Sequence, residues 1–269
     1  MKDSKQKKQK IYFALIWFLV IILPFISLTL GRYSVTLKQF LGTIFPSLSE
    51  TEEISKAAYN VIFKIRIPRI LLAMLAGAGL SVAGASFQSI FSNPLASPDT
   101  LGVATGASFG AVLGILLKMP YWAIQLTALA FGLVAVFLVF TVSSIRGKAS
   151  IVMIVLAGMV ISALFSALVS LVKFTADPQD VLPAVTFWLM GTLQGTSLTT
   201  LANGAPFIIT GIAVITVFRY KLNLLTLSED EATSLGINVK RSRIVIILAA
   251  SLITASVVSM CGLIGWVGL

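Results

Sequence analysis

Long apolar runs separated by short polar connectors make up most of this 269-residue chain. A transmembrane helix needs about 20 consecutive apolar residues, and most of these runs are close to that length. We therefore predict an all-α fold, a polytopic transmembrane helix bundle of about seven spans in a single domain that covers residues 1–269. The predicted spans are residues 11–30, 66–91, 100–117, 121–142, 151–172, 201–218 and 244–261.

The composition supports a membrane protein, because 57% of the residues are hydrophobic and only 11% are charged. Soluble domains carry about a quarter charged residues. The net charge of +10 does not indicate nucleic-acid binding, since the basic residues lie in short connectors and not on one face or in an aromatic-interleaved tract. With one cysteine and no histidine, we expect no internal disulfide, no metal site and no cofactor.

The distribution of basic residues predicts how the spans are oriented. Lysines crowd the first ten residues, and further basic residues lie in the connectors 143–150 and 219–243. The positive-inside rule places the N-terminus and these connectors on the cytoplasmic side. The run at 11–30 is too long for a typical signal-peptide core and is followed by no A-x-A cleavage pattern, so we predict that it remains as the first span.

Basic residues before and within the second span run against this rule, because they lie on the predicted outer side. They are Arg32, Lys38, Lys56, Lys64, Arg66 and Arg69. Lysine and arginine at a helix end can extend their charged groups to the membrane surface. The alternative is a basic surface that binds an acidic partner outside the cytoplasm. In that case Arg66, which precedes Pro68, would keep its guanidinium in water.

The connector 219–243 is the only long polar passage in the second half of the chain. Ser228 is predicted to cap a short helix, with Glu231 as its capping-box partner and Gly236 as the left-handed residue that ends it. Glu229 belongs to the acidic cluster in the first turn. Because a helix of about two turns is not stable alone, we expect a partner protein to hold it.

No carboxylate lies within a predicted span, because all ten acidic residues fall in connectors or at span ends. Ion-coupled secondary transporters usually place ionisable groups near the membrane midplane, so that class is the alternative and not the preferred hypothesis. A membrane-embedded enzyme would need a nucleophile, base or metal cluster within the spans, and none is present. The chain also lacks a P-loop motif. We therefore expect no catalytic residue and a separate ATPase as the energy source.

Glycines recur at steps of four residues in the third predicted span, at Gly102, Gly106, Gly110 and Gly114. In a helix they would form one flat ridge, which lets a neighbouring helix approach closely. We interpret the ridge as a helix-packing surface. The alternative is that it borders a passage for a bulky solute.

The second predicted span ends at Asn93-Pro94-Leu95. A proline at the end of a span leaves backbone groups that, at membrane depth, we expect only a cavity or a neighbouring protein to satisfy. This segment is therefore predicted to form a constriction on the inner side of the membrane.

Motifs of uncommon spacing follow one another from about residue 60 to residue 269. They are Arg66-Ile-Pro-Arg69, Gly77-Ala-Gly-Leu-Ser-Val-Ala-Gly84, Gln88, Asn93-Pro-Leu-Ala96, Leu101-Gly102-Val, Leu156-Ala-Gly158, Phe187-Trp188-Leu-Met-Gly191, Leu222-Asn-Leu-Leu225, Leu235-Gly236-Ile-Asn-Val and Gly262-Leu-Ile-Gly265-Trp-Val-Gly268-Leu. Together they resemble the permease family of ABC importers for iron–siderophores, haem and cobalamin, which are type II importers.

This resemblance implies a permease subunit that takes up an iron–siderophore, or haem or cobalamin, across the bacterial cytoplasmic membrane. The implied partners are a second permease subunit, two cytoplasmic ABC ATPases and an extracytoplasmic solute-binding protein or lipoprotein. Resembling permeases continue beyond the last motif with further spans, so the chain is expected to hold about seven of ten spans.

The resemblance also assigns roles to residues of this chain. The residues that dock the binding protein would be Arg66 and Arg69. The cytoplasmic gate would be formed by Asn93 and Leu95. The helix that couples the permease to the ATPase would contain Ser228, Glu229, Glu231, Leu235 and Gly236.

Overall fold

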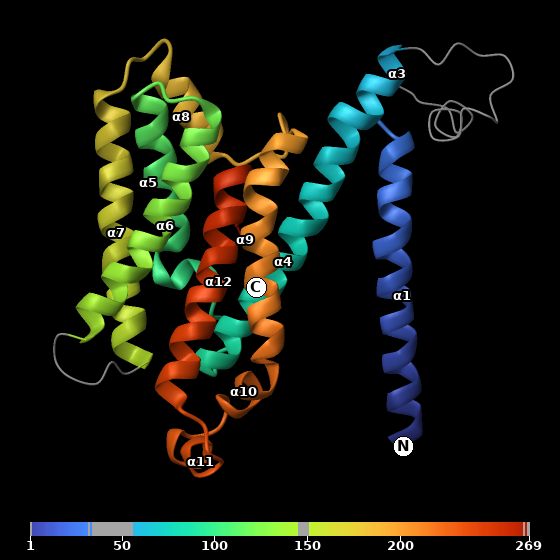
Figure 1. The fold of residues 1–269 in the computed structure, drawn as a ribbon, viewed down its shortest axis with the longest axis vertical. Helices are drawn as coiled ribbons and strands as arrows, with labels where there is room; N and C mark the ends of the chain where they lie inside the picture. The colour runs from blue at the N-terminus through green and yellow to red at the C-terminus, as the bar shows by residue number, and fades with distance from the viewer. Residues whose placement is uncertain (1, 32, 34–55, 145–150, 266, 268–269) are drawn as a thin grey trace, which may run out of the picture. The chain divides into compact units, whose positions relative to one another are not determined.

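The structure is a computed structural model that describes residues 2–31, 33, 56–144, 151–265 and 267 (Figure 1). Every regular element in these ranges is a helix, which confirms the all-α prediction. The elements are α1 (Lys2–Thr29), α3 (Lys56–Asn60), the π-helix η2 (Val61–Arg66), α4 (Ile67–Phe91), the 3₁₀-helix η3 (Pro98–Leu101), α5 (Val103–Leu116), α6 (Tyr121–Ser144), α7 (Ile151–Thr175), α8 (Val181–Leu189), α9 (Leu198–Val217), α10 (Arg219–Leu224), α11 (Glu229–Ser234) and α12 (Val239–Cys261).

Six stretches of the described residues are long and apolar enough to cross a membrane, which confirms a polytopic bundle. They are Gln6–Thr29, Ala57–Phe91, Tyr121–Ser144, Ile151–Thr175, Leu198–Val217 and Val239–Cys261. The second of these joins α3, η2 and α4, so it begins earlier than the predicted start at Arg66. The third predicted span is the helix α5, whose 14 residues are fewer than the roughly 20 that cross a bilayer.

The chain divides into two compact units, which we describe separately. One comprises Met1–Leu72 with Gly195–Leu198, and the other comprises Ala73–Gln194 with Thr199–Leu269. The single domain predicted over residues 1–269 therefore stays a prediction. In the first unit, Ile62 of η2 is fully buried and packs against Leu28 in the last turn of α1.

In the second unit, α12 lies against α4, α5, α6 and α9. In α12, 78% of the most apolar 18-residue stretch is buried, whereas in α7 the buried share is 28%. The helix α12 is therefore the most enclosed of the six spans. It packs against α5 and α6, and α5, α6 and α7 lie side by side (Figure 1). Small buried side chains in its second half, such as Ala250, Ser251 and Ala255, allow this close approach.

Glycines on three helices face α12 and contact it directly. A Cβ atom on Gly132 of α6 would lie 2.7 Å from the Cβ of Ala255. A Cβ on Gly79 of α4 would lie 2.8 Å from Cγ2 of Ile253, and a Cβ on Gly211 of α9 would meet the same isoleucine. Because van der Waals contact between carbon atoms begins near 3.5 Å, a larger residue at any of these positions would separate the helices.

The glycine ridge of α5 is filled by α6. A Cβ on Gly106 would lie 2.8 Å from the carbonyl oxygen of Phe131, and one on Gly114 would lie 3.0 Å from Oγ1 of Thr127. Gly110, between them, faces the same turns of α6. Three of the four predicted ridge positions therefore lie against a neighbouring helix of the same chain.

Gly102 departs from this pattern, and the prediction of a four-glycine ridge is wrong at this position. Its φ of 71° is left-handed, and it separates η3 from α5. A Cβ there would lie 2.9 Å from Oγ of Ser162 on α7. Gly102 thus turns the chain and lies against a different helix from the other three glycines.

The connector between α4 and α5 rests on α7 at Gly158. A Cβ on Gly158 would meet the carbonyl oxygen of Thr100 and would lie 3.0 Å from Cα of Leu101. These neighbours are backbone atoms, which cannot swing aside as a long side chain can. The absence of a side chain at Gly158 is therefore what allows η3 to lie directly on α7.

We predict that Gly158→Ala destabilises the fold by about 1–3 kcal/mol, because the added methyl group overpacks this contact. Gly77→Ala is the matched control on α4, since nothing lies within 4 Å of a Cβ at that position. Alanine there should stabilise the helix by roughly 0.5–1 kcal/mol. Thermal unfolding of the full chain in one detergent measures both changes. A midpoint for Gly158→Ala at or above that of the parent chain would contradict the contact.

Candidate functional site

The connector 219–243 folds into α10, α11 and the first turn of α12, at one end of α12 (Figure 1). Oγ of Ser228 accepts a hydrogen bond from the backbone N–H of Glu231 at 3.4 Å. The Glu231 carboxylate in turn accepts hydrogen bonds from the N–H of Ser228 at 3.1 Å and from its hydroxyl group at 2.8 Å. The predicted capping box is confirmed.

The other end of α11 is closed at Gly236, as predicted. Gly236 has a φ of 82°, and its N–H donates to the carbonyl of Thr233 at 2.9 Å. The N–H of Ile237 donates to the carbonyl of Ala232 at 3.3 Å, which completes a Schellman motif. The side chains of Ala232 and Ile237 are both buried. Hydrogen bonds therefore close both ends of α11, and apolar burial anchors it.

The surface of α11 combines acidic groups with one large apolar side chain. Leu235 is 59% exposed, and Glu229 and Glu231 are exposed as well. Hydrogen bonds from the hydroxyl and the N–H of Ser228 lower the pKa of the Glu231 carboxyl below its ordinary value of 4.5. The end of this helix therefore presents an exposed leucine close to acidic side chains, which suits recognition by another protein.

The connector after α4 is a tight turn whose backbone groups are satisfied locally. Ser92 has a left-handed φ of 47°, and the N–H of Asn93 donates to the carbonyl of Gln88 at 3.1 Å. Oδ1 of Asn93 accepts the N–H of Leu95 at 2.9 Å, and the N–H of Ala96 donates to the carbonyl of Asn93 at 3.1 Å. The prediction that only a cavity or a neighbouring protein could satisfy this backbone is therefore wrong.

Leu95 stands at the tip of this turn and is 73% exposed. Asn93 is exposed too, but its side chain is held by the turn. The buried side chains of Ala96 and Leu101 anchor the segment on its other side. The structure thus places an exposed leucine on an ordered turn, and the gate role of Asn93 and Leu95 stays a prediction.

Arg66 is buried, so the prediction that its guanidinium stays in water is wrong. The residue is 8% exposed. Its Nη1 donates to the carbonyl of Leu28 and its Nη2 to the carbonyl of Tyr33. The last carbonyls of a helix have no partner within the helix, so Arg66 caps the C-terminal end of α1. It does so because η2 packs beside the end of α1 in this unit.

Arg69, the second residue predicted for docking, is half-buried in the first turn of α4. Its Nε is buried and has no hydrogen-bond partner among the described residues. Lys64 is exposed, whereas the side chains of Arg32, Lys38 and Lys56 lie outside the described part of the chain. Docking at Arg66 and Arg69 stays a prediction.

The tertiary structure also joins two motifs that sequence reasoning did not connect. Gly191, after α8, and Gly262, after α12, have φ values of 69° and 71°. A Cβ on Gly262 would lie 3.0 Å from Cα of Gly191, and the N–H of Thr192 donates to the carbonyl of Cys261 at 2.7 Å. The only sign of this contact in the sequence is that both motifs contain a glycine. A glycine does not show which segment of the chain will pack against it.

The chemistry that these segments offer is recognition. Each connector holds an exposed leucine, Leu95 or Leu235, beside polar groups that hydrogen bonds fix in place. Across the described ranges, no group of three or more histidine, cysteine, aspartate or glutamate side chains is arranged to hold a metal ion.

Comparison with known proteins gives a consistent result. The sequence model of the FecCD transport family matches residues 19–269. The chain is 38% identical to the molybdate import system permease protein MolB of Haemophilus influenzae, over 93% of this chain and 74% of that protein. It is 32% identical to the iron(3+)-hydroxamate import system permease protein FhuG of Bacillus subtilis, over 99% of this chain and 80% of that protein.

A further relative is the hemin transport system permease protein HmuU of Yersinia pestis, which is 30% identical over 100% of this chain and 78% of its own length. Among solved structures, a metal-chelate type ABC transporter in an inward-facing conformation superposes with a TM-score of 0.83 and 36% identity. That match covers 97% of this chain and 78% of the solved chain. The similarity therefore extends over both candidate connectors.

We predict that Ser228→Ala loosens α11, because the N-terminal cap is lost. Amide hydrogen exchange at Glu231 should become about fivefold faster, which is the worth of a typical N-cap. Ser234→Ala is the control in the same helix, since that hydroxyl donates to the carbonyl of Asp230 and caps neither end.

The same measurement has a defined pH dependence. The pKa of Glu231 is lowered from 4.5, so its contribution is complete above that value and is lost as the pH falls through the lowered pKa. The difference between the parent and Ser228→Ala should therefore narrow in more acidic solution, to the part that comes from the bond between the N–H of Glu231 and the Ser228 hydroxyl. Equal exchange rates at neutral pH would show that the capping box does not hold the helix.

Proposed function

Because this chain belongs to the FecCD transport family of ABC importer permeases, we propose that it carries an iron–siderophore into the cell, driven by ATP hydrolysis in a separate subunit. The complex would contain a second permease subunit, two cytoplasmic ABC ATPases and an extracytoplasmic solute-binding protein. The six apolar stretches support a multi-pass protein. We place it in the bacterial cytoplasmic membrane with its N-terminus inside.

The ATP-driven part of this proposal rests on one observation, which is that the short helix α11 is held in a defined conformation by hydrogen bonds at both ends. A helix of six residues is not stable by itself, yet this one is capped at both ends and exposes Leu235. A helix that is ordered before it binds loses little conformational entropy when a partner encloses it. Asn238 caps α12 directly after α11, so a displacement of the short helix would be passed to the central span.

The substrate that we propose is an iron chelate. Iron(3+)-hydroxamate and hemin are named for the relatives FhuG and HmuU, and the solved structure is of metal-chelate type. Molybdate is a second candidate, favoured by 38% identity to MolB over 93% of this chain. The two candidates differ in size and charge, because molybdate is a small dianion and a ferric siderophore is a bulky chelate.

We place the cytoplasmic gate at Asn93 and Leu95. Leu95 is exposed at the tip of a turn that Asn93 holds in place. Two such leucines, one from each permease subunit, would close a passage by an apolar constriction that excludes water. The ordered turn favours a gate that moves as a unit with the end of α4.

Uptake by the assembled transporter in proteoliposomes tests the function. A ferric hydroxamate, haem, cobalamin and molybdate are offered separately, with the binding protein outside and ATP inside. We expect uptake of the ferric hydroxamate that requires ATP and persists when an uncoupler is added at constant ATP. Uptake of molybdate alone would establish the second candidate, and uptake that collapses with the uncoupler would point to an ion-coupled carrier.

The role of α11 is tested in the same assay with Leu235→Glu. A charge at the centre of an apolar contact should weaken ATPase binding and lower uptake by roughly tenfold or more. Leu235→Met is the matched control, because it keeps an apolar side chain of similar size and should retain uptake. If Leu235→Glu retains both co-purification with the ATPase and uptake, α11 is not the coupling element, although the chain can still be a permease.

We propose that the binding protein docks at Arg66, the last residue of η2, and at Arg69, in the first turn of α4. For Arg66 this requires the guanidinium to leave the carbonyls of Leu28 and Tyr33. Arg66→Glu should then slow capture of the loaded binding protein about tenfold at low salt and less at high salt, because rim charges act on association rate.

Arg66→Gln is the control for this prediction, because it removes the charge without reversing it and keeps an N–H donor for the carbonyls. Its capture rate should lie between those of the parent and Arg66→Glu. Equal rates for all three across a salt series would leave capping of α1 as the function of Arg66.

A further inference from the structure

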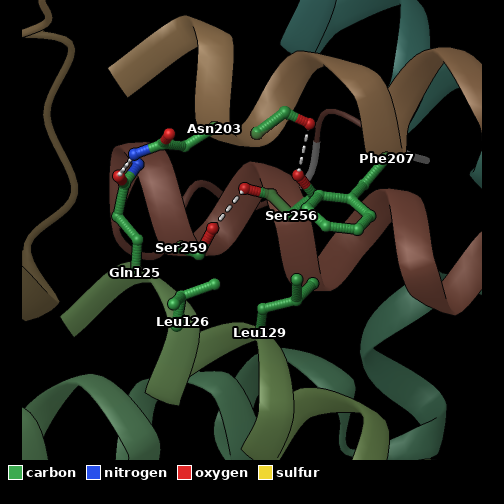
Figure 2. A pocket seen from close by; sticks show the side chains of 8 residues that line it. Gln125, Leu126, Leu129, Asn203, Phe207, Ser256 and Ser259 are labelled. Carbon is green, nitrogen blue, oxygen red and sulfur yellow. Dashed lines mark hydrogen bonds between the residues drawn. The ribbon is translucent and has the colours of Figure 1, made fainter. Parts of the chain in front are cut away.

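A small cavity lined by both apolar and polar side chains lies among α6, α9 and α12 in the second unit (Figure 2). Gln125 lines it from the second turn of α6, Asn203 and Phe207 from α9, and Ser256 and Ser259 from the last turns of α12. These turns lie at the start of α6 and α9 and at the end of α12, which the charge distribution predicts to be the outer end of the bundle.

Hydrogen bonds link the lining residues across helix boundaries (Figure 2). Nδ2 of Asn203 donates to Oε1 of Gln125 at 3.4 Å, which joins α9 to α6. Oγ of Ser256 donates to the carbonyl of Gly204 at 2.9 Å, which joins α12 to α9. Oγ of Ser259 donates to the carbonyl of Ser256 at 2.8 Å, within α12. None of these three bonds joins α6 to α12, although Oη of Tyr121, one turn before Gln125, donates to the carbonyl of Met260 in α12 at 3.5 Å.

Gln125 is the residue whose hydrogen bonding is incomplete. It is only 5% exposed, and Ser256 and Ser259 beside it are 0% and 4% exposed. Its Nε2 is buried and has no hydrogen-bond partner among the described residues. If both amides were turned over, Oε1 of Gln125 would be the unpaired atom instead. A buried polar atom without a partner is costly, so the site favours a ligand that can bond to it.

The cavity provides the room and the partners for such a ligand. It leaves about 10 Å³ in which the centre of a water molecule fits, which is space for about one water molecule. The hydroxyl oxygens of Ser256 and Ser259 each donate their hydrogen elsewhere, so their lone pairs are available as acceptors. A water molecule that accepts from Nε2 of Gln125 and donates to these oxygens would make three hydrogen bonds, the usual number for buried water.

We propose that this cavity binds one structural water molecule, which bridges Gln125 of α6 to Ser259 and Ser256 of α12. The bridge adds a second hydrogen-bonded link between α6 and α12, beside the one from Tyr121 to Met260. Asn203 of α9 and Leu126 of α6 are the exposed members of the lining, so the water exchanges with its surroundings on the side where these two residues lie. The proposal does not depend on the substrate or partners proposed above.

Hydroxyl-radical footprinting of the full transporter complex in ¹⁸O-labelled water tests the proposal. X-ray radiolysis of a bound water oxidises the side chains that contact it, and Phe207 lines the cavity. We expect Phe207 to take up ¹⁸O slowly after mixing, as the bound water exchanges. Phe87 of α4 is fully buried and does not line the cavity, so its oxidation defines the background.

Two variants remove the site by different means. Gln125→Leu deletes the unpaired amide, and Ser259→Val deletes an acceptor and fills the cavity. Oxidation of Phe207 should fall to the Phe87 background in both. Gln194→Leu changes an exposed glutamine outside the cavity and should keep the oxidation and exchange rate of the parent. If one of the two cavity variants does not assemble, the other carries the test.

Two results would overturn the proposal. Oxidation of Phe207 at the Phe87 level in the parent would mean that the cavity is dry. Oxidation in Gln125→Leu and Ser259→Val equal to that of the parent, with label taken up within the mixing time, would mean that bulk solvent and not a bound water reaches Phe207.

Discussion

Close approach of helices at glycine positions is the constraint on which the rest of this structure depends. Inside a bilayer the hydrophobic effect does not drive helices together, because lipid tails are as apolar as the side chains. Helix association therefore relies on close van der Waals packing and interhelical hydrogen bonds. Gly79, Gly132 and Gly211 bring three helices against α12, and Gly106 brings α5 against α6. The connectors that carry the candidate sites are placed by these contacts, because each begins or ends on a helix held in this way.

The two candidate connectors share a physical design, in which the backbone is satisfied locally and a leucine is left outside. At α11 a capping box and a Schellman motif close a very short helix. After α4, the side chain of Asn93 holds the turn. Leu95 and Leu235 are therefore exposed on ordered segments. An exposed apolar group on an ordered segment is suited to contact another subunit, since little entropy is lost on binding.

Burial gives Arg66 a structural role that its sequence context did not predict. Its guanidinium pairs with backbone carbonyls at the end of α1, where unpaired acceptors and the negative end of the helix dipole both favour a cation. The structural role and the proposed docking role compete for the same N–H groups.

Features that depend on neighbours along the chain could be predicted from the amino-acid sequence. Apolar run length predicted all six stretches that are long enough to cross a membrane, but it also predicted a span at residues 100–117, where α5 has only 14 residues. The order of Ser228, Glu231 and Gly236 predicted α11 with both of its ends, because capping uses hydrogen bonds over three to five residues. The tertiary structure alone decided the contacts over longer distances. It placed Gly102 on α7 and outside the α5 ridge, buried Arg66 against α1, and joined Gly191 to Gly262. Such contacts depend on which helices become neighbours, and interhelical packing is not encoded in the periodicity of any one segment.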